Sequence, residues 1–237
     1  MIPTTAFVLA AGLGTRMRPL TDDRPKALVE VGGRTLIDHM LDRLRDAGAR
    51  RFIVNVHAFA DRLEAHLKAR TDLDIIISDE RQALLETGGG MKKARPLLGE
   101  DPIWAANIDS VWLEKAADGT AMRALCELWN PATMDAALLL APMERTTGFD
   151  GAGDFFMDGD HRLAFRNAAP SAPLNYMGVH ITKPQLVDEI SDPVFSLARI
   201  WRERAPLGRI GGVVMDGDWM HVGDPDALAI AESKLRE

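Results

Sequence analysis

One stretch of the chain reads Leu9-Ala-Ala-Gly-Leu-Gly-Thr-Arg-Met-Arg-Pro-Leu-Thr21 and continues directly as Asp22-Asp-Arg-Pro-Lys-Ala-Leu28. The apolar run from Ala6 to Ala11 predicts a buried strand that ends in a glycine-bearing turn. Gly12 and Gly14 carry no Cβ, so backbone N–H groups can close around an anionic oxygen. Loops that follow parallel strands hold phosphates in this way in α/β proteins. The stretch therefore predicts an α/β fold with a phosphate-binding loop.

The side chains of this loop fit an anionic ligand. Thr15 adds a hydroxyl donor, and Arg16 and Lys26 place positive charge at the two ends of the loop. A Walker A loop requires a different glycine spacing, and Met17 stands where a dinucleotide-binding fingerprint requires its third glycine. The alternative is an ordinary glycine turn with two solvated cations, but chance matches to a motif are usually shorter than this run.

The run closely resembles the signature of the sugar-1-phosphate nucleotidylyltransferases. These enzymes join a nucleoside triphosphate to a sugar 1-phosphate and release pyrophosphate. The resemblance implies a Rossmann-like three-layer α/β sandwich with a mostly parallel central sheet, of the nucleotide-diphospho-sugar transferase type. It implies catalytic roles for Arg16 and Lys26, and nucleotide contacts from the loop residues Ala10, Ala11, Gly12, Gly14, Thr15, Arg16 and Lys26.

Composition restricts the classes of partner. The 237 residues carry a formal net charge of −7, whereas nucleic-acid binders are normally basic. Cys126 is the single cysteine, which excludes an internal disulfide and fits a reducing compartment. No apolar span is long enough to cross a bilayer. We therefore expect a cytoplasmic protein that binds neither nucleic acid nor membrane; the sequence does not specify its oligomeric state.

Strands and helices alternate through the first half of the chain. This alternation predicts a parallel sheet covered by helices. From residue 134 the sequence no longer shows this regular alternation. Residues 148–159 are rich in Gly and Asp and predict a hairpin or flap. We expect one nucleotidyltransferase domain over 1–237, with a nucleotide-binding part (1–133) and a sugar-binding part (134–237). The expected strands cover 51–56, 74–78, 102–106, 136–141, 163–166, 176–181 and 209–215, and the expected helices lie within 36–48, 61–68, 89–98, 195–201 and 227–235.

A second motif, Leu85-Glu-Thr-Gly-Gly-Gly90, lies between an expected strand and an expected helix. Its glycines allow close approach to a flat ring, or they form a flexible helix cap, and spacing alone does not separate the two. In the family that the chain resembles, the matching segment helps to read the nucleobase, which implies nucleotide-binding roles for Glu86 and Gly88. The segment is particularly similar to that of the N-acetylmuramate-1-phosphate uridylyltransferases.

A third motif, Ala105-Ala-Asn-Ile-Asp109, ends an expected strand. A carboxylate facing a phosphate loop suits Mg²⁺, although an aspartate in a turn is the commoner case. The family usually shows Asn-Gly-Asp here, so Asp109 matches its catalytic metal ligand, Asn107 matches a nucleotide-binding position, and Ile108 is a departure.

A fourth motif, Trp219-Met-His-Val-Gly-Asp-Pro225, carries another departure. Relatives place a second metal-binding Asp where this chain has His221. Imidazole suits zinc, copper or iron better than magnesium. His221 either joins the metal site, binds a ligand phosphate, or leaves Asp109 as the only protein carboxylate on the ion. Asp218 and Asp224 are close enough in sequence to compensate.

The acceptor sugar is expected at Asn175-Tyr-Met-Gly178, which resembles the family strand that contacts the sugar phosphate through Asn175 and Gly178. The preceding residues 163–170 lack the Glu-Lys pair of many guanylyl- and thymidylyltransferases. The resemblance thus implies transfer from UTP to N-acetylmuramate 1-phosphate in cell-wall (peptidoglycan) sugar recycling. The alternatives are a mannose-1-phosphate guanylyltransferase or related enzyme, and a non-catalytic nucleotide-sugar sensor.

Overall fold

A nine-stranded sheet forms the centre of the computed structural model, which describes residues 2–236. Strand β1 (Thr5–Leu9) lies between β4 and β6 and is parallel to both. Every other strand except β11 and β12 also points in the direction of β1, so the prediction of a mostly parallel sheet is confirmed. The remaining strands are β4 (Arg51–Val56), β5 (Asp74–Asp79), β6 (Ile103–Asn107), β8 (Ala136–Pro142), β10 (Phe155–Met157), β11 (Leu163–Phe165), β12 (Leu174–Thr182) and β13 (Ile210–Val214).

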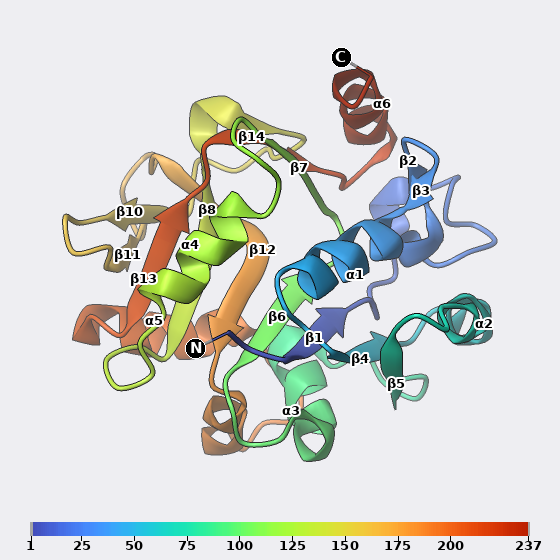
Figure 1. The fold of residues 1–237 in the computed structure, drawn as a ribbon, viewed down its shortest axis with the longest axis horizontal. Helices are drawn as coiled ribbons and strands as arrows, with labels where there is room; N and C mark the ends of the chain where they lie inside the picture. Colours follow the sequence, from blue (N-terminus) through green and yellow to red (C-terminus); the bar gives the residue numbers. More distant parts are fainter. Residues whose placement is uncertain (1, 237) are drawn as a thin grey trace.

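Helices cover both faces of this sheet (Figure 1). Alternate side chains of β1 point to opposite faces, so Ala6 and Val8 join one buried cluster and Phe7 joins the other. The first cluster includes side chains of α1 (Leu36–Asp46), α2 (Ala60–Ala69) and α4 (Thr120–Leu128). The second includes side chains of α3 (Glu86–Leu98) and α5 (Leu197–Arg204). The three-layer arrangement predicted from the sequence is therefore confirmed.

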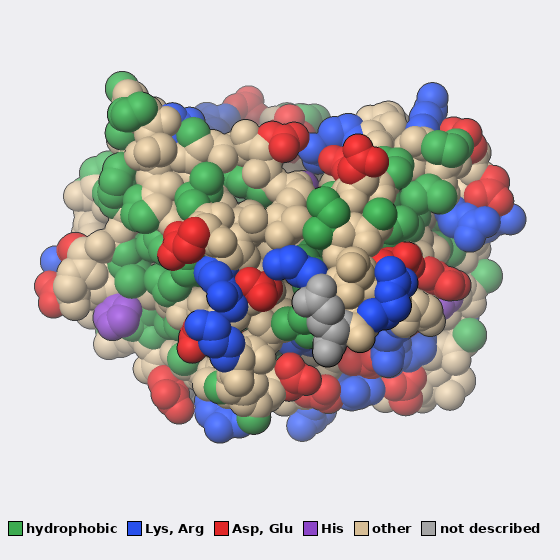
Figure 2. All heavy atoms as spheres, turned by 90° about the horizontal axis from the view of Figure 1, so that it is seen from above, with side chains coloured by type: hydrophobic (Ala, Val, Ile, Leu, Met, Phe, Trp, Pro, Cys, Tyr) green, Lys and Arg blue, Asp and Glu red, His purple; other side chains and the backbone are tan. Residues whose placement is uncertain are grey.

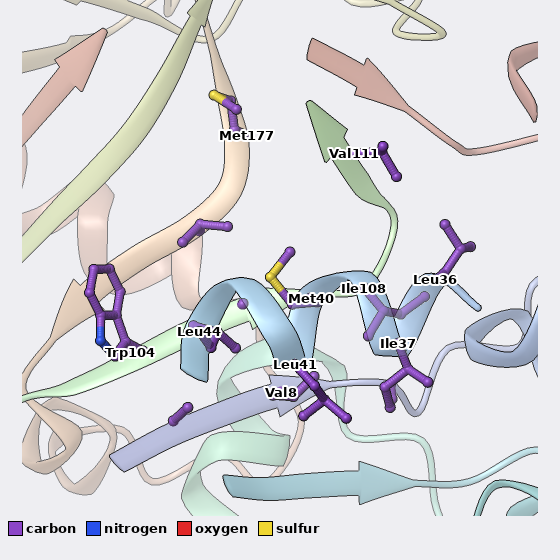
Figure 3. Close-up of a cluster of buried hydrophobic side chains, with 14 of the residues drawn as sticks. Val8, Leu36, Ile37, Met40, Leu41, Leu44, Trp104, Ile108, Val111 and Met177 are labelled. Carbon is purple, nitrogen blue, oxygen red and sulfur yellow. The ribbon is translucent and has the colours of Figure 1, made fainter. Parts of the chain in front are cut away.

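Helix α1 shows how the first cluster forms. Its apolar side chains recur at a spacing of three to four residues, and the Thr35 side chain caps its N-terminus by accepting from the Asp38 N–H at 3.3 Å. In Figure 3 these side chains lie against Val8, Trp104 and Ile108. Ile108 is only 5% exposed. The residue that departs from the family pattern thus fills the core beneath α1.

Several short elements were not predicted from the sequence. The most important is a three-stranded sheet of β7 (Ser110–Glu114), β14 (Gly217–His221) and β9 (Thr146–Thr147). Helix α4 was also missed. The other short elements are the hairpin β2 (Glu30–Val31) and β3 (Arg34–Thr35), and the 3₁₀ helices at Thr15–Met17, Lys26–Leu28, Met143–Arg145, Pro184–Glu189 and Ala205–Leu207.

The observed boundaries of several elements differ from the predicted ones by a few residues. Helix α3 begins at Glu86, three residues before the predicted start. The segment 148–159 contains β10, which forms an antiparallel hairpin with β11, as one of the two expectations stated. The chain closes with α6 (Pro225–Lys234).

The surface carries both signs of charge. On the face shown in Figure 2, acidic and basic side chains are interspersed with hydrophobic ones. None of the helices formed by residues 2–236 combines the length and the apolar character needed to cross a bilayer.

Candidate functional site

A cleft of about 490 Å³ opens where β1 and β6 end. Leu9 of β1 pairs with Asn107 of β6, so the two loops that follow these strands leave the sheet side by side. The structure brings most of the predicted site residues to this cleft. Those that line it are Ala10, Ala11, Gly12, Gly14, Thr15, Arg16, Lys26, Glu86, Asn107 and Asp109.

The turn at Gly14 brings the start of the loop close to Lys26. Gly14 has φ +63°, and a Cβ built on it would lie 2.9 Å from Lys26 Cβ. Its carbonyl accepts from Thr21 Oγ1 at 2.8 Å and from the Met17 N–H at 2.9 Å. A side chain at this position would strain the backbone and push Lys26 away. Arg16, by contrast, is exposed at the rim of the cleft.

Lys26 and Asp109 form an ion pair at the base of the cleft. Lys26 Nζ lies 2.8 Å from Asp109 Oδ2, with side chains 11% and 22% exposed. Burial by itself would raise the pKa of Asp109, but the hydrogen bond from His221 and the charge of Lys26 hold that pKa well below its ordinary value. The carboxylate is therefore ionised at neutral pH and can bind a cation.

His221 meets Asp109 from the small sheet. Its Nε2 lies 3.3 Å from Asp109 Oδ2, and its Nδ1 lies 3.0 Å from the Gly148 carbonyl oxygen. Burial opposes protonation of the imidazole, but the hydrogen bond and charge of Asp109 outweigh it and raise the His221 pKa. Asp218 instead pairs with Arg145 at 3.0 Å, and Asp224 Oδ1 caps α6 by accepting from the Ala227 N–H. The suggestion that these two carboxylates compensate for His221 is therefore not supported.

The donor set permits one divalent cation. Among residues 2–236 no three His, Cys, Asp or Glu side chains form a group that could hold a metal ion. Asp109 lines the cleft and His221 does not, but the Nε2 atom of His221 lies 3.3 Å from Asp109 Oδ2, which makes these two side chains a pair of potential ligands. A divalent cation bound here would complete its shell with water and nucleotide phosphates, as Mg²⁺ usually does in such sites.

Two residues that sequence reasoning missed hold the start of the loop. Asn55 Oδ1 accepts from the N–H groups of Ala10 and Ala11 at 2.6 and 3.1 Å. Asn55 Nδ2 donates to Glu80 Oε1 at 2.8 Å. Burial raises the pKa of the Glu80 carboxyl, and the bond from Asn55 lowers it in part. Both side chains line the cleft, and a polar residue at the end of the apolar strand 51–56 was the available signal.

The glycines of the second motif serve the packing of α3. The N–H groups of Gly88 and Gly89 both donate to the Phe195 carbonyl, at 2.8 and 3.0 Å. A Cβ on Gly88 would lie 2.3 Å from the Phe195 ring. Gly88 does not line the cleft, whereas Glu86 does and has a left-handed φ of 60°. The nucleobase role of Gly88 stays a prediction, and close packing is a reason for glycine that the sequence did not reveal.

The two residues predicted for the sugar lie on β12. Gly178 has φ +81°, and a Cβ on it would lie 3.1 Å from Asn107 Cβ, so the strand passes close to the cleft. Asn175 is fully buried; its Nδ2 donates to Thr146 Oγ1 at 3.1 Å, and its Oδ1 has no hydrogen-bond partner among residues 2–236. Neither residue lines the cleft itself.

Comparisons with known proteins agree with this geometry. Residues 6–169 match the MobA-like NTP transferase domain. The chain is 53% identical over 239 residues to an N-acetylmuramate alpha-1-phosphate uridylyltransferase of Caulobacter vibrioides, covering 99% of this chain and 98% of that protein. It is 34% identical over 232 residues to a protein of the same name from Neisseria meningitidis, covering 96% of each. The inositol-1-phosphate CTP transferase of T. maritima shares the fold, with a TM-score of 0.79 at 16% identity over 100% of this chain and 98% of that one.

Proposed function

The chain belongs to the MobA-like NTP transferase family, and we propose that it transfers a uridylyl group from UTP to N-acetylmuramate 1-phosphate. As a sugar-1-phosphate nucleotidyltransferase, it would release UDP-N-acetylmuramate and pyrophosphate, a product suited to cell-wall sugar recycling. Both relatives described above are uridylyltransferases, which favours UTP over the guanylyl alternative. The non-catalytic alternative is not favoured, because Arg16, Lys26 and Asp109 together supply the charges that the transfer requires.

Residues 1–133 would bind the nucleotide. Because Asn55 takes the N–H groups of Ala10 and Ala11, the loop from Gly12 to Thr15 and the exposed Arg16 are left to hold the β- and γ-phosphates. Glu86 and Asn107, which also line the cleft, would contact the rest of the nucleotide. Gly88, which has no side chain, would allow the backbone of the second motif to lie near the nucleobase.

Residues 134–237 would bind the acceptor. Gly178 supports this assignment because β12 approaches Asn107 there. For Asn175 the support is its place on the same strand and its buried Oδ1 atom, which has no hydrogen-bond partner among residues 2–236.

The transfer itself needs positioning and charge neutralisation. An oxygen of the sugar phosphate attacks the α-phosphorus of UTP, and the bond to pyrophosphate breaks. Lys26 would bridge the α-phosphate and the incoming phosphate, since its Nζ already lies at the base of the cleft. A divalent cation, Mg²⁺ in this proposal, supplies further charge neutralisation when bound. Asp109 would hold it, with His221 alongside.

The observation that carries the proposal is the convergence of the glycine loop, Arg16, Lys26 and Asp109 in one cleft. The test measures pyrophosphate release with Mg²⁺ for each common nucleoside triphosphate against N-acetylmuramate, mannose, glucose and N-acetylglucosamine 1-phosphates. We expect a strong signal for UTP with N-acetylmuramate 1-phosphate. A stronger signal for another pair would reassign the substrates, and nucleotide binding without any release would support the sensor.

Lys26→Ala tests the mechanism. We expect turnover to fall by about 10²–10³-fold, because a preorganised charge that acts mainly in the transition state is lost. UTP binding, measured by calorimetry, should weaken much less. Lys68→Ala, on the exposed side of α2, is the matched control. Near-normal turnover in Lys26→Ala would refute the role given to Lys26.

A further inference from the structure

The imidazole of His221 is fixed in one orientation. Its Nδ1 lies 3.0 Å from the Gly148 carbonyl oxygen. A carbonyl oxygen only accepts hydrogen bonds, so Nδ1 must carry a hydrogen. Nε2, the nitrogen that faces Asp109, lies 3.3 Å from its Oδ2 atom; there it acts as a donor to the carboxylate, and it becomes a metal ligand when a cation displaces its proton. A histidine that donates one ring N–H to a carbonyl and presents the other nitrogen has the arrangement of a metal ligand.

Packing holds the ring in this place. Phe149 and Trp219 lie against it with ring centroids at 6.1 and 5.9 Å. The backbone at Gly223 also lies close to the ring, since a Cβ on Gly223 would come within 2.9 Å of His221 Cε1. The backbone also holds His221 close to Asp109, because the N–H of the next residue, Val222, donates to the Asp109 carbonyl at 2.9 Å. Nε2 and the Asp109 carboxylate are thus preorganised as a pair.

Charge pairing alone does not require this histidine. Lys26 Nζ already lies 2.8 Å from the same Oδ2 atom, so Asp109 has a permanent positive partner without His221. When triphosphate enters the cleft, Lys26 gains phosphate oxygens as alternative partners, and Asp109 becomes available to a cation. His221 then has a role that a second positive charge does not explain.

We propose that His221 Nε2 and Asp109 form a mixed imidazole–carboxylate site for the divalent cation that accompanies the nucleotide. This site should select Mn²⁺ over Mg²⁺ more strongly than a pair of carboxylates would. Imidazole nitrogen favours transition-metal ions, and Mg²⁺ strongly prefers oxygen. The inference rests on the proposed function, because the nucleotide phosphates complete the site.

The test is a pulsed electron paramagnetic resonance measurement on the full chain with Mn²⁺ and a non-hydrolysable UTP analogue. We expect nitrogen coupling to Mn²⁺ in the wild-type protein, and a changed pattern when histidine alone is labelled with ¹⁵N. Labelling needs no substitution, so this arm does not depend on a variant folding. His221→Asp should still bind Mn²⁺ but lose the histidine coupling, and its ratio of Mn²⁺ to Mg²⁺ affinity should fall. His161→Asn, at an exposed turn with φ +62°, should keep both.

Failure of this inference can be separated from failure of the proposed function. Bound Mn²⁺ without histidine coupling, or Mn²⁺ that does not bind where Mg²⁺ does, would overturn the metal-site assignment even if UTP still yields pyrophosphate. Histidine coupling in a protein that releases no pyrophosphate from UTP and N-acetylmuramate 1-phosphate would leave the metal site standing and overturn the substrates.

Discussion

Asn55 shows how one side chain can shape the proposed phosphate-binding loop without being part of its motif. Its amide oxygen takes two consecutive N–H groups of the loop, and its amide nitrogen is held by Glu80. These contacts join the ends of β1, β4 and β5 beneath the cleft. The first turn of the loop is therefore fixed before a ligand enters.

Asn55→Ala should destabilise the protein and weaken nucleotide binding. Two buried N–H groups would lose their partner, at a cost of about 2–4 kcal/mol in the free energy of unfolding, and the loop would lose its support. Urea unfolding and the KM for UTP measure the two effects. Glu80→Gln is the matched control for stability, because Gln keeps an oxygen that can accept from Asn55. Equal unfolding free energies for Asn55→Ala and the wild type would show that the loop does not depend on this bond.

The charged residues that line the cleft could be predicted from the sequence, but the residues that hold the loop in place could not. Arg16, Lys26 and Asp109 stand in recognisable motifs, and the structure places all three at one cleft. Asn55 is 45 residues away from the N–H group of Ala10 that it binds. No local pattern identifies a partner at that separation. Closeness in sequence was also a poor guide. Asp218 and Asp224 are near His221 in the chain, but the fold does not place them beside Asp109.

At the scale of elements, most strands of the central sheet could be predicted, whereas helix α4 and the strands of the small sheet formed by β7, β14 and β9 could not. Strands such as 51–56 are buried along their length and need only their own apolar run to be recognised. Strand β14 has five residues, and its partner β7 lies about a hundred positions earlier in the chain. Because its pairing is entirely non-local, the sequence did not show that it brings His221 to Asp109.

The glycines of two elements should respond differently to alanine. A Cβ on Gly89 of α3 would lie 2.2 Å from the Pro193 carbonyl oxygen, whereas a Cβ on Gly12 would meet nothing within 4 Å. We expect Gly89→Ala to lower the free energy of unfolding by about 1–3 kcal/mol through overpacking. Gly12→Ala should unfold like the wild type but bind UTP less well, because its methyl group would occupy the cleft.

Thermal unfolding and UTP titration on both variants check this contrast. Loss of stability in Gly12→Ala would contradict the open space assigned to the loop, and normal stability in Gly89→Ala would contradict the tight packing assigned to the start of α3.

Two of the molecule's groups of buried charges lie at opposite edges of the sheet, one where the parallel strands end and one where they begin. The cleft lies at the carboxyl ends of β1 and β6, and Asp135 lies at the opposite edge, just before β8. Asp135 accepts from Arg209 at 2.6 and 2.7 Å and from Lys183 at 2.9 Å. It therefore joins the ends of β8, β12 and β13, all in the part of the chain assigned to the sugar.

Asp135 should make stability, but not catalysis, sensitive to acid. Burial opposes its ionisation, yet the hydrogen bonds from Arg209 and Lys183 lower its pKa to about 2. Because the folded pKa lies below the unfolded value of 3.8, the stabilisation is complete above that value and is lost as pH falls toward 2.

Asp135→Asn should lower the free energy of unfolding at pH 7 by about 3 kcal/mol, flatten its decline between pH 4 and pH 2, and leave turnover unchanged at pH 7. Urea unfolding across this pH range measures the effect, with the exposed Asp101→Asn as control. An unchanged acid slope in Asp135→Asn would assign the acid sensitivity to other carboxylates, and reduced turnover at pH 7 in the folded variant would show that the two edges of the sheet are coupled.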